Sequence, residues 1–353
     1  QPEIIADTLR PAEERIQNAI DQMTLEEKVR LCFGGERFGE VVLPGVPRLE
    51  IGPIYAADGP RGVRAGDVTV FPSGIGLAAT WNPQLVEQTG QVIGSESRAR
   101  GIGMVFGPAF NINRDPLGGR FFEYLTEDPY LNGKLAAAQV RGMQREGVSA
   151  CIKHFAVNSR DLNRNWYMSR VDERTLREIY LRGYEIAVKE ADPWGCMTAA
   201  NGLNGELCSY NEWLLNEVLK KEWGFKGLVL TDFCHSRSTV KAALAGLDID
   251  MPWGDFETIL FGKPLMEAVE RGEVPEAVLN EMVRRILWVK YKTGVLDHKD
   301  LKAGASVNTK EHQEVARQAA EESMVLLKNE NDLLPLDLNK TKRVVLIGPN
   351  CAQ

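Results

Sequence analysis

The chain has 353 residues, long enough for one large domain and part of a second. Its composition, 44% hydrophobic and 26% charged, is that of a globular protein, and the net charge of -7 comes from acidic and basic residues mixed along the whole chain. No basic stripe is present, and no apolar run approaches the roughly 20 residues that span a bilayer. We therefore expect neither nucleic acid nor a membrane as a partner.

Two further features bear on metals and location. Six cysteines are scattered along the chain without a CxxC pair, so we expect no zinc site. The first residue is Gln1 rather than Met, which leaves a processed start open, and with it a cytoplasmic, periplasmic or secreted location. A homo-oligomer is likewise left open by the sequence.

Helical and strand-like segments alternate along most of the chain. Residues 12–32 have the apolar spacing of an amphipathic helix, and Thr24 followed by Glu27 is a capping box for a segment that starts near Leu25. The expected strands are Ile51–Ala57, Met104–Phe106, Ala150–Phe155, Gly195–Ala199, Leu228–Thr231 and Leu247–Met251. The expected helices lie near residues 85–100, 130–145, 172–190, 210–222, 236–245 and 262–270.

This alternation predicts a mainly parallel sheet covered by helices. Over about 250 residues, a TIM-like (β/α)8 barrel is the natural closure, and a doubly wound sheet is the alternative. We therefore assign residues 1–295 to a barrel with an N-terminal helical extension. In such a barrel, functional side chains lie at the C-terminal ends of the strands.

The character of the sequence changes after Lys292. Residues 296–310 are polar and predict a linker. Residues 311–353 predict the incomplete start of a second α/β domain, with a helix at about Glu311–Leu327 and a buried strand at Arg343–Ile347.

Polar side chains follow the expected strands at the end where a barrel places its chemistry. Asp58 follows the first strand, Lys153 and His154 end a later one, and Asn201 and Asp232 follow two more. A carboxylate held rigidly at Asp232 can attack the anomeric carbon of a sugar and form a glycosyl-enzyme. The same residue can instead cap the following helix, and its position alone leaves both interpretations open.

Lys153 and His154 place two basic groups side by side. Lysine offers hydrogen-bond donors to sugar hydroxyls, and histidine offers a donor and an acceptor. The alternatives are a Lys–carboxylate pair beside a buried structural histidine, or a Schiff-base lysine. In either case the two side chains reach a common ligand only where the strand gives way to a loop, because adjacent strand residues point to opposite faces.

The densest polar segment spans residues 111–129. Within it, Arg120, Glu123 and Asp128 can form an ion-pair network, although an arginine fork also suits vicinal hydroxyls. Aromatic residues near the candidate loops can stack on a sugar or pack in the core. They are Trp166, Phe233 and Trp253.

Taken together, these segments resemble glycoside hydrolase family 3, the β-glucosidase-like enzymes, from about Met23 to the end of the chain. The motifs that carry the resemblance are Asp58-Gly-Pro-Arg-Gly-Val-Arg, Gly107-Pro-Ala-Phe-Asn-Ile-Asn-Arg-Asp-Pro, Gly119-Arg-Phe-Phe-Glu, Glu127-Asp-Pro, Lys153-His-Phe, Val171-Asp-Glu-Arg-Thr-Leu-Arg-Glu-Ile-Tyr, Gly224-Phe-Lys-Gly, Thr231-Asp and Ala245-Gly-Leu-Asp-Ile-Asp-Met-Pro. Their order along the chain makes the match specific.

The resemblance implies a barrel followed by an α/β sandwich, and a retaining, exo-acting β-glycosidase that needs no metal or cofactor. Asp232 matches the family's nucleophile. The residues that match those holding the sugar in the first subsite are Asp58, Arg120, Lys153, His154, Arg164 and Met197. The Asp-Gly-Pro setting of Asp58 favours a β-glucosidase. The alternatives are a β-xylosidase or α-L-arabinofuranosidase, or a sugar-binding homologue without turnover.

Three features depart from the family pattern. Ala200 stands where the family usually has a tyrosine that contacts the nucleophile, and Phe233-Cys234 replaces a common Trp-Gly. The general acid/base of this branch lies in the second domain, beyond the residues present here. We therefore expect a C-terminal domain or fragment as the partner that supplies it, because retention needs two carboxyl groups about 5 Å apart. Glu123 is the nearest alternative acid by motif, and we expect it to be structural.

Overall fold

The computed structural model describes residues 5, 7–37, 40–252, 254–299, 302, 304, 306–348 and 351. Its centre is a curved seven-stranded sheet with the order β1-β2-β3-β4-β5-β7-β10. The strands are β1 (Gly35–Arg37), β2 (Glu40–Leu43), β3 (Ile54–Asp58), β4 (Met104–Phe106), β5 (Ser149–Phe155), β7 (Gly195–Thr198) and β10 (Leu228–Leu230). Strands β4, β5, β7 and β10 are buried along their whole length, as expected for strands covered on both faces.

The two edges of this sheet are linked through residues 247–251. Ile249 forms a parallel bridge with Leu230 of β10, and Asp250 forms one with Phe33, just ahead of β1. The Gly34 N–H donates to the Asp250 carbonyl at 2.9 Å. The sheet is therefore curled into a barrel, and the predicted TIM-like α/β fold is confirmed.

The first strands depart from a strict (β/α)8 pattern. β2 is antiparallel to both β1 and β3, whereas the pairs from β3 to β10 are parallel. Only the short 3-10 turn η1 (Pro47–Leu49) lies between β2 and β3. Antiparallel neighbours can be joined by a short turn, whereas parallel strands need a crossover, so this part of the chain closes the barrel without a helix.

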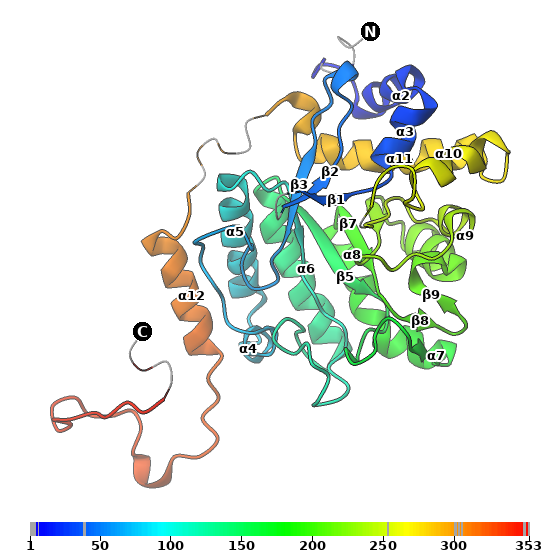
Figure 1. Ribbon diagram of the computed structural model, residues 1–353. Helices are drawn as coiled ribbons and strands as arrows, with labels where there is room; N and C mark the ends of the chain where they lie inside the picture. The colour runs from blue at the N-terminus through cyan, green and yellow to red at the C-terminus, as the bar shows by residue number, and fades with distance from the viewer. Residues whose placement is uncertain are drawn as a thin grey trace.

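Helices cover the outside of the sheet (Figure 1). They are α4 (Gly74–Ala79), α5 (Pro83–Ala99), α6 (Pro129–Arg145), α7 (Glu173–Thr175), η2 (Leu176–Tyr180), α8 (Arg182–Ala191), η4 (Trp213–Glu222), α9 (Thr239–Ala245), α10 (Lys263–Glu270) and α11 (Glu276–Lys292). α5 and α6 approach closely because glycines face each other: a Cβ on Gly90 would lie 2.4 Å from the Gln139 carbonyl oxygen, and one on Gly142 would lie 2.1 Å from that of Glu87.

The N-terminal extension forms two helices rather than one. α2 (Ala12–Gln22) ends at Met23, and α3 (Leu25–Leu31) begins with the predicted capping box of Thr24 and Glu27. These helices gather with α10 and α11 at one end of the body (Figure 1). The buried Arg15 guanidinium fastens them there through a 2.7 Å ion pair with Asp297, which follows α11.

A three-stranded sheet lies apart from the barrel strands. It has the order β6-β8-β9, with β6 (Met168–Ser169), β8 (Gly202–Leu203) and β9 (Glu206–Leu207). β6 pairs parallel with β8, and the Gly202 N–H donates to the Tyr167 carbonyl at 3.0 Å. The loop after β5 is thereby fixed to the loop after β7.

The last part of the chain differs from its prediction. The expected helix Glu311–Leu327 is α12 (Lys310–Glu322), which ends earlier. The expected strand at Arg343–Ile347 is wrong: the segment is not assigned to a strand, and Val344–Ile347 are exposed. A strand needs a neighbour to complete its hydrogen bonds, and the described residues offer this segment none. After α12 the chain runs away from the body (Figure 1).

Three general features concern cysteines, metals and membranes. All six cysteines are free, and four of them are buried. Within the described ranges, no group of three or more His, Cys, Asp or Glu side chains is placed to hold a metal ion. None of the helices in the same ranges is both long and apolar enough to cross a bilayer.

Glu96 of α5 fastens α12 to the barrel. Its buried carboxylate accepts hydrogen bonds from the Thr69 N–H at 2.7 Å and from the Asn308 N–H at 2.8 Å. One of its oxygens also lies 2.8 Å from His312 Nδ1 on α12. The start of α12 therefore depends on one buried charge.

We predict that Glu96→Ala lowers the free energy of unfolding by about 2 to 4 kcal/mol, because several donors lose one buried acceptor. Urea unfolding and limited proteolysis between α11 and α12 measure the effect. The matched control is Glu322→Ala, which removes only an exposed bond to Asn82. Equal proteolysis of the two variants would contradict this account of α12.

Lys290 of α11 is a buried cation. Its ammonium donates to the Gly52 carbonyl at 2.8 Å, and burial lowers its pKa to about 7. A lysine in the unfolded chain keeps its proton up to about pH 10.4. Between these values the unfolded state binds the extra proton, so stability rises with pH by at most about 1.4 kcal/mol per pH unit.

We expect Lys290→Met to flatten the pH dependence of stability between about pH 7 and pH 10, because the titrating group is gone. Chemical unfolding at a series of pH values measures the slope. Lys221→Met, at a mostly exposed lysine, is the control and should keep the parent slope. An unchanged slope in Lys290→Met would show that this lysine titrates alike in both states.

Candidate active site

Asp232 lies just after β10, and its neighbours hold it in place. The backbone N–H groups of Thr231 and Cys234 donate to carbonyls of residues 247–251 at 3.1 and 3.0 Å. The carboxylate is mostly buried, and its Oδ1 accepts the Phe233 N–H at 2.8 Å. Its Oδ2 finds no hydrogen-bond donor among the described residues. A fixed carboxylate with one oxygen free of donors keeps lone pairs available for bonding.

The helix-cap interpretation of Asp232 is wrong. α9 begins at Thr239, and its N-cap is Ser238, whose hydroxyl accepts the Lys241 N–H at 3.4 Å. Asp232 bonds instead to the N–H of the next residue, within the loop that precedes this cap. Its carboxylate therefore has no part in starting the helix.

The end of β5 brings Lys153 and His154 to one place. The register of β5 against β7 shifts just before the end of the strand. The Asn111 amide satisfies the backbone there, because its Oδ1 accepts the His154 N–H at 2.9 Å and its Nδ2 donates to the His154 carbonyl at 2.8 Å. The Tyr184 hydroxyl donates to the same carbonyl at 2.9 Å. Every backbone group of His154 is thus paired despite the irregular strand.

Lys153 is the centre of an ion-pair network. Its buried ammonium lies 2.5 Å from Asp58 Oδ1 and 3.9 Å from Glu123 Oε2. Glu123 also accepts a hydrogen bond from Arg120 Nε. Arg120 in turn lies 3.7 Å from Asp161. The Lys–carboxylate pair left open by the sequence is therefore present, and Glu123 is bound within the network.

Asp58 is held in its charged form. Burial alone would raise the pKa of Asp58, but the charge and hydrogen bond of Lys153, with the charges of Arg64 and Arg120, outweigh it and lower the pKa below its usual value. The side chain remains 33% exposed at the end of β3. An ionised carboxylate in this position can accept hydrogen bonds from two neighbouring hydroxyls.

His154 is buried and neutral. Burial lowers its pKa well below the ordinary value, and nearby basic groups lower it further. Those groups are Arg120, Lys153, Arg164 and His235. The imidazole is therefore influenced by its neighbour in β5 and by side chains from three separate loops.

The hydrogen bonds of His154 assign its tautomer. The Tyr124 hydroxyl lies 3.1 Å from Nδ1, and its oxygen already accepts a hydrogen bond from Asn158 Nδ2. We therefore assign the hydroxyl hydrogen to Nδ1 and the ring proton to Nε2. Nε2 lies 4.0 Å from Asp232 Oδ2, so the neutral imidazole presents an N–H toward that carboxylate.

The other two predicted residues adjoin this cluster. Arg164 NH1 donates to Asp161 at 2.7 Å, and Asp161 also faces Arg120. Met197 is buried on β7, in register with Leu230 of β10. The structure thus brings Asp232 and the predicted binding residues to one end of the barrel, while their roles toward a sugar stay predictions.

Sequence reasoning missed several supporting residues. Tyr124 and Asn158 orient His154, Asn111 holds its backbone, and Asp161 joins two arginines. Their signal was adjacency: Tyr124 directly follows Glu123 in the recognised motif, and the others lie within or beside motifs already singled out.

The three candidate aromatic platforms differ. Phe233 packs edge-on against Phe106 with ring centroids 6.4 Å apart. Trp166 is 78% exposed. Trp253 lies outside the described residues. Among the described candidates, only Trp166 therefore presents most of its side chain to solvent.

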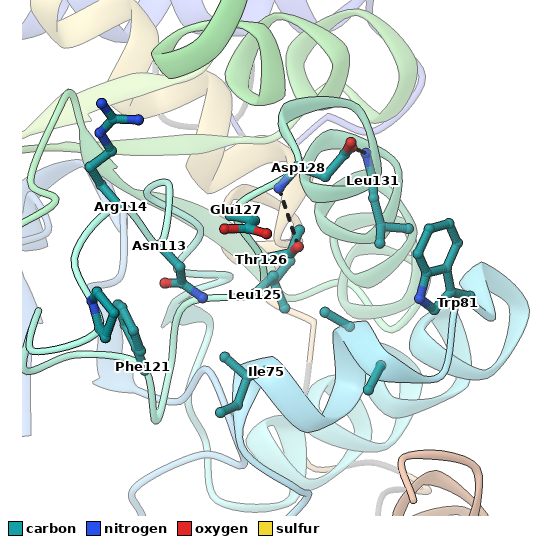
Figure 2. Close-up of a pocket in the computed structure, with 13 residues that line it drawn as sticks. Ile75, Trp81, Asn113, Arg114, Phe121, Leu125, Thr126, Glu127, Asp128 and Leu131 are labelled. Carbon is teal, nitrogen blue, oxygen red and sulfur yellow. Dashed lines mark hydrogen bonds between the residues drawn. The ribbon is translucent and has the colours of Figure 1, made fainter. Parts of the chain in front are cut away.

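A pocket of about 560 Å³ lies elsewhere, between α4 and the segment of residues 113–131. Figure 2 shows Trp81 and Ile75 on one side and Phe121 and Asn113 on the other. None of the predicted site residues lines it. Its volume alone does not make it the reactive site, because the charged cluster and the free carboxylate oxygen are not there.

Comparison with known proteins fits this geometry. Residues 47–289 match the N-terminal domain of glycosyl hydrolase family 3. This chain belongs to glycosyl hydrolase family 3. The ammonium of Lys153 is engaged by Asp58, as the Lys–carboxylate alternative expected.

The curated relatives that the chain matches include beta-glucosidases. The chain is 45% identical to thermostable beta-glucosidase B of Acetivibrio thermocellus over 346 residues, which is 94% of this chain and 44% of that protein. It is 38% identical to beta-glucosidase B of Emericella nidulans over 346 residues, or 95% of this chain and 40% of that protein. The chain therefore spans about half the length of the curated relatives it matches.

Solved family 3 structures have the same fold. Beta-glucosidase 3B from Thermotoga neapolitana, in complex with alpha-D-glucose, superimposes with a TM-score of 0.85 at 40% identity, covering 92% of this chain and 48% of that one. DesR, a beta-glucosidase from Streptomyces venezuelae in complex with D-glucose, gives a TM-score of 0.86 at 37% identity, covering 92% and 43%.

We predict that Lys153→Met raises the pKa of Asp58 above its ordinary value, because burial remains while the closest positive charge is lost. Carboxyl-carbon NMR titration measures this pKa. Lys134→Met is the control, since its partner is the remote Glu190. A pKa of Asp58 that stays low in Lys153→Met would assign its stabilisation to the arginines instead.

Proposed function

We propose that the complete protein is a retaining, exo-acting β-glucosidase that hydrolyses terminal non-reducing β-D-glucosyl residues, with Asp232 as its nucleophile. The observation that carries this proposal is the position of Asp232: fixed after β10, with a free Oδ2 facing the neutral His154 and the Asp58–Lys153 pair nearby. The names of the relatives favour a glucoside over a xyloside or arabinoside. No metal or cofactor is part of the proposal.

The polar cluster suits the binding of one glucose unit. Asp58 accepts hydrogen bonds from hydroxyls, while Lys153 and Arg120 donate to hydroxyl oxygens. The Nε2–H of His154 can donate to a hydroxyl beside the reacting carbon, since it already points toward Asp232. Arg164 and Met197 complete the expected first subsite. The cluster contains both acidic and basic side chains, so a neutral ligand with many hydroxyls fits it better than an anion.

The chemistry is a double displacement. A carboxylate oxygen of Asp232 attacks the anomeric carbon, and the bond to the leaving oxygen breaks as a second carboxyl group gives that oxygen its proton. The same group, now a carboxylate, then takes a proton from water. The water oxygen bonds to the anomeric carbon, and Asp232 leaves as a carboxylate.

The second carboxyl group comes from a C-terminal part in this proposal. Glu123, the nearest alternative acid by motif, has a 3% exposed side chain and is engaged by Arg120 and Lys153, so its oxygens are already used. We propose residues 1–295 as the barrel, 296–310 as the linker and 311–353 as the start of an α/β sandwich domain. The exposed apolar residues near the end of the chain support a further partner for that segment.

We predict that a 2-deoxy-2-fluoro-β-D-glucoside with a good leaving group labels Asp232 in the full-length protein. The fluorine slows release of the glycosyl-enzyme while the good leaving group keeps its formation fast, so the labelled protein accumulates. Peptide mass spectrometry locates the label. Asp232→Asn should abolish labelling and lower kcat by about a thousandfold or more. Asp192→Asn, at an exposed carboxylate, is the control. Failure to label would favour a sugar-binding homologue without turnover.

We also predict that the 353-residue chain alone does not turn over an unactivated β-glucoside, because its leaving group needs an acid. Adding the C-terminal part in trans, or using the full-length protein, should restore hydrolysis. Glucose release measures both. Full turnover by the chain alone would refute the proposed source of the acid/base.

A further inference from the structure

Two loops at the barrel end that carries Asp232 are joined through Asn165. The His235 imidazole Nε2 lies 2.7 Å from Asn165 Oδ1, and Arg237 NH2 donates to the Asn165 carbonyl at 2.9 Å. His235 and Arg237 lie in the loop that follows Asp232, and the His235 N–H donates to the Asp232 carbonyl at 3.3 Å. Asn165 directly follows Arg164. The junction is therefore built from the same loops as the candidate site.

Trp166 projects from this junction. Its side chain is 78% exposed, although its backbone is fixed: its N–H donates to the Asn163 carbonyl at 2.9 Å, and the next residues enter the β6–β8 pairing. The Arg237 guanidinium lies 4.8 Å from the centre of its ring. Cation–π contact of this kind favours one orientation of the ring. An exposed indole backed by arginine is thus a fixed flat surface.

The location of this surface follows from its neighbours. Asp232 acts electrostatically on His235, and so does Arg164. Asp232 is the proposed nucleophile and Arg164 belongs to the proposed glucose subsite. Trp166 lies two residues after Arg164 and, at 78% exposed, outside the buried cluster.

We propose that Trp166, positioned by Arg237 and Asn165, is the platform of the leaving-group subsite and stacks on the second sugar ring of a β-linked glucosyl disaccharide. This inference rests on the proposed function. Aromatic rings and the apolar face of a pyranose pack against each other, and the free donors of a guanidinium beside the ring suit sugar hydroxyls. Phe233 packs against Phe106 and so serves the inner wall instead.

The test compares two ligands of one protein. Glucose fills only the first subsite, whereas cellobiose also places a ring on the platform. Binding of both is measured by calorimetry with the full-length protein carrying Asp232→Asn, which prevents hydrolysis. Trp166→Ala should weaken cellobiose binding about tenfold and leave glucose binding unchanged. Trp166→Phe should keep most of the cellobiose affinity, because a flat ring remains.

Trp81→Ala is the matched control. Trp81 is also highly exposed, at 74%, but it lines the separate pocket in Figure 2. It should change neither affinity. Equal cellobiose affinity in Trp166→Ala and its parent would overturn the platform, and so would a parallel loss of glucose affinity. Absence of glucose binding in the parent would instead refute the proposed function.

Discussion

The buried ammonium of Lys153 is the constraint on which the site depends. A lysine removed from water needs carboxylates and hydrogen bonds around it, and Asp58 at 2.5 Å with Glu123 at 3.9 Å supplies them. Glu123 then needs Arg120, which in turn faces Asp161. The order of β3, β4 and β5 in the sheet makes this possible, because it brings the ends of β3 and β5 to one side of the barrel. This buried charge thus organises the loops around it.

The same cluster explains why His154 is neutral. Burial and the nearby basic groups both destabilise the protonated imidazole, so its pKa is lowered. The hydrogen bond with Tyr124 then determines which ring nitrogen keeps the remaining hydrogen. The pKa of Asp58 is lowered and that of Arg120 is raised, so these two groups keep their charges. The histidine adds a directed N–H without adding a charge, and its Nε2 lies 4.0 Å from Asp232 Oδ2.

Much of the fold could be predicted because buried parallel strands are short apolar runs followed by polar residues. Asp58, Lys153, His154 and Asp232 were found by that rule. β1 and β2 were missed because residues 35–43 mix charged and apolar side chains in short runs. Residues 343–347 satisfied the rule yet form no strand, since pairing depends on a neighbour and not on composition. Tyr124 and Asn158 were missed because they act only through His154: their place beside recognised motifs is visible in the sequence, but their contact with the imidazole is not.

The closure of the barrel has a consequence for synthesis of the protein. Phe33 meets Asp250 near opposite ends of the barrel sequence, so nearly the whole domain must leave the ribosome before the sheet loses its free edges. Until then, the antiparallel strands β1 to β3 form an open meander with unpaired backbone groups. In a nascent chain that lacks residues 247–251, these exposed strand edges can pair with the wrong strands, and such pairing competes with folding. Formation of the bridges of Ile249 and Asp250 is therefore the step that ends that exposure.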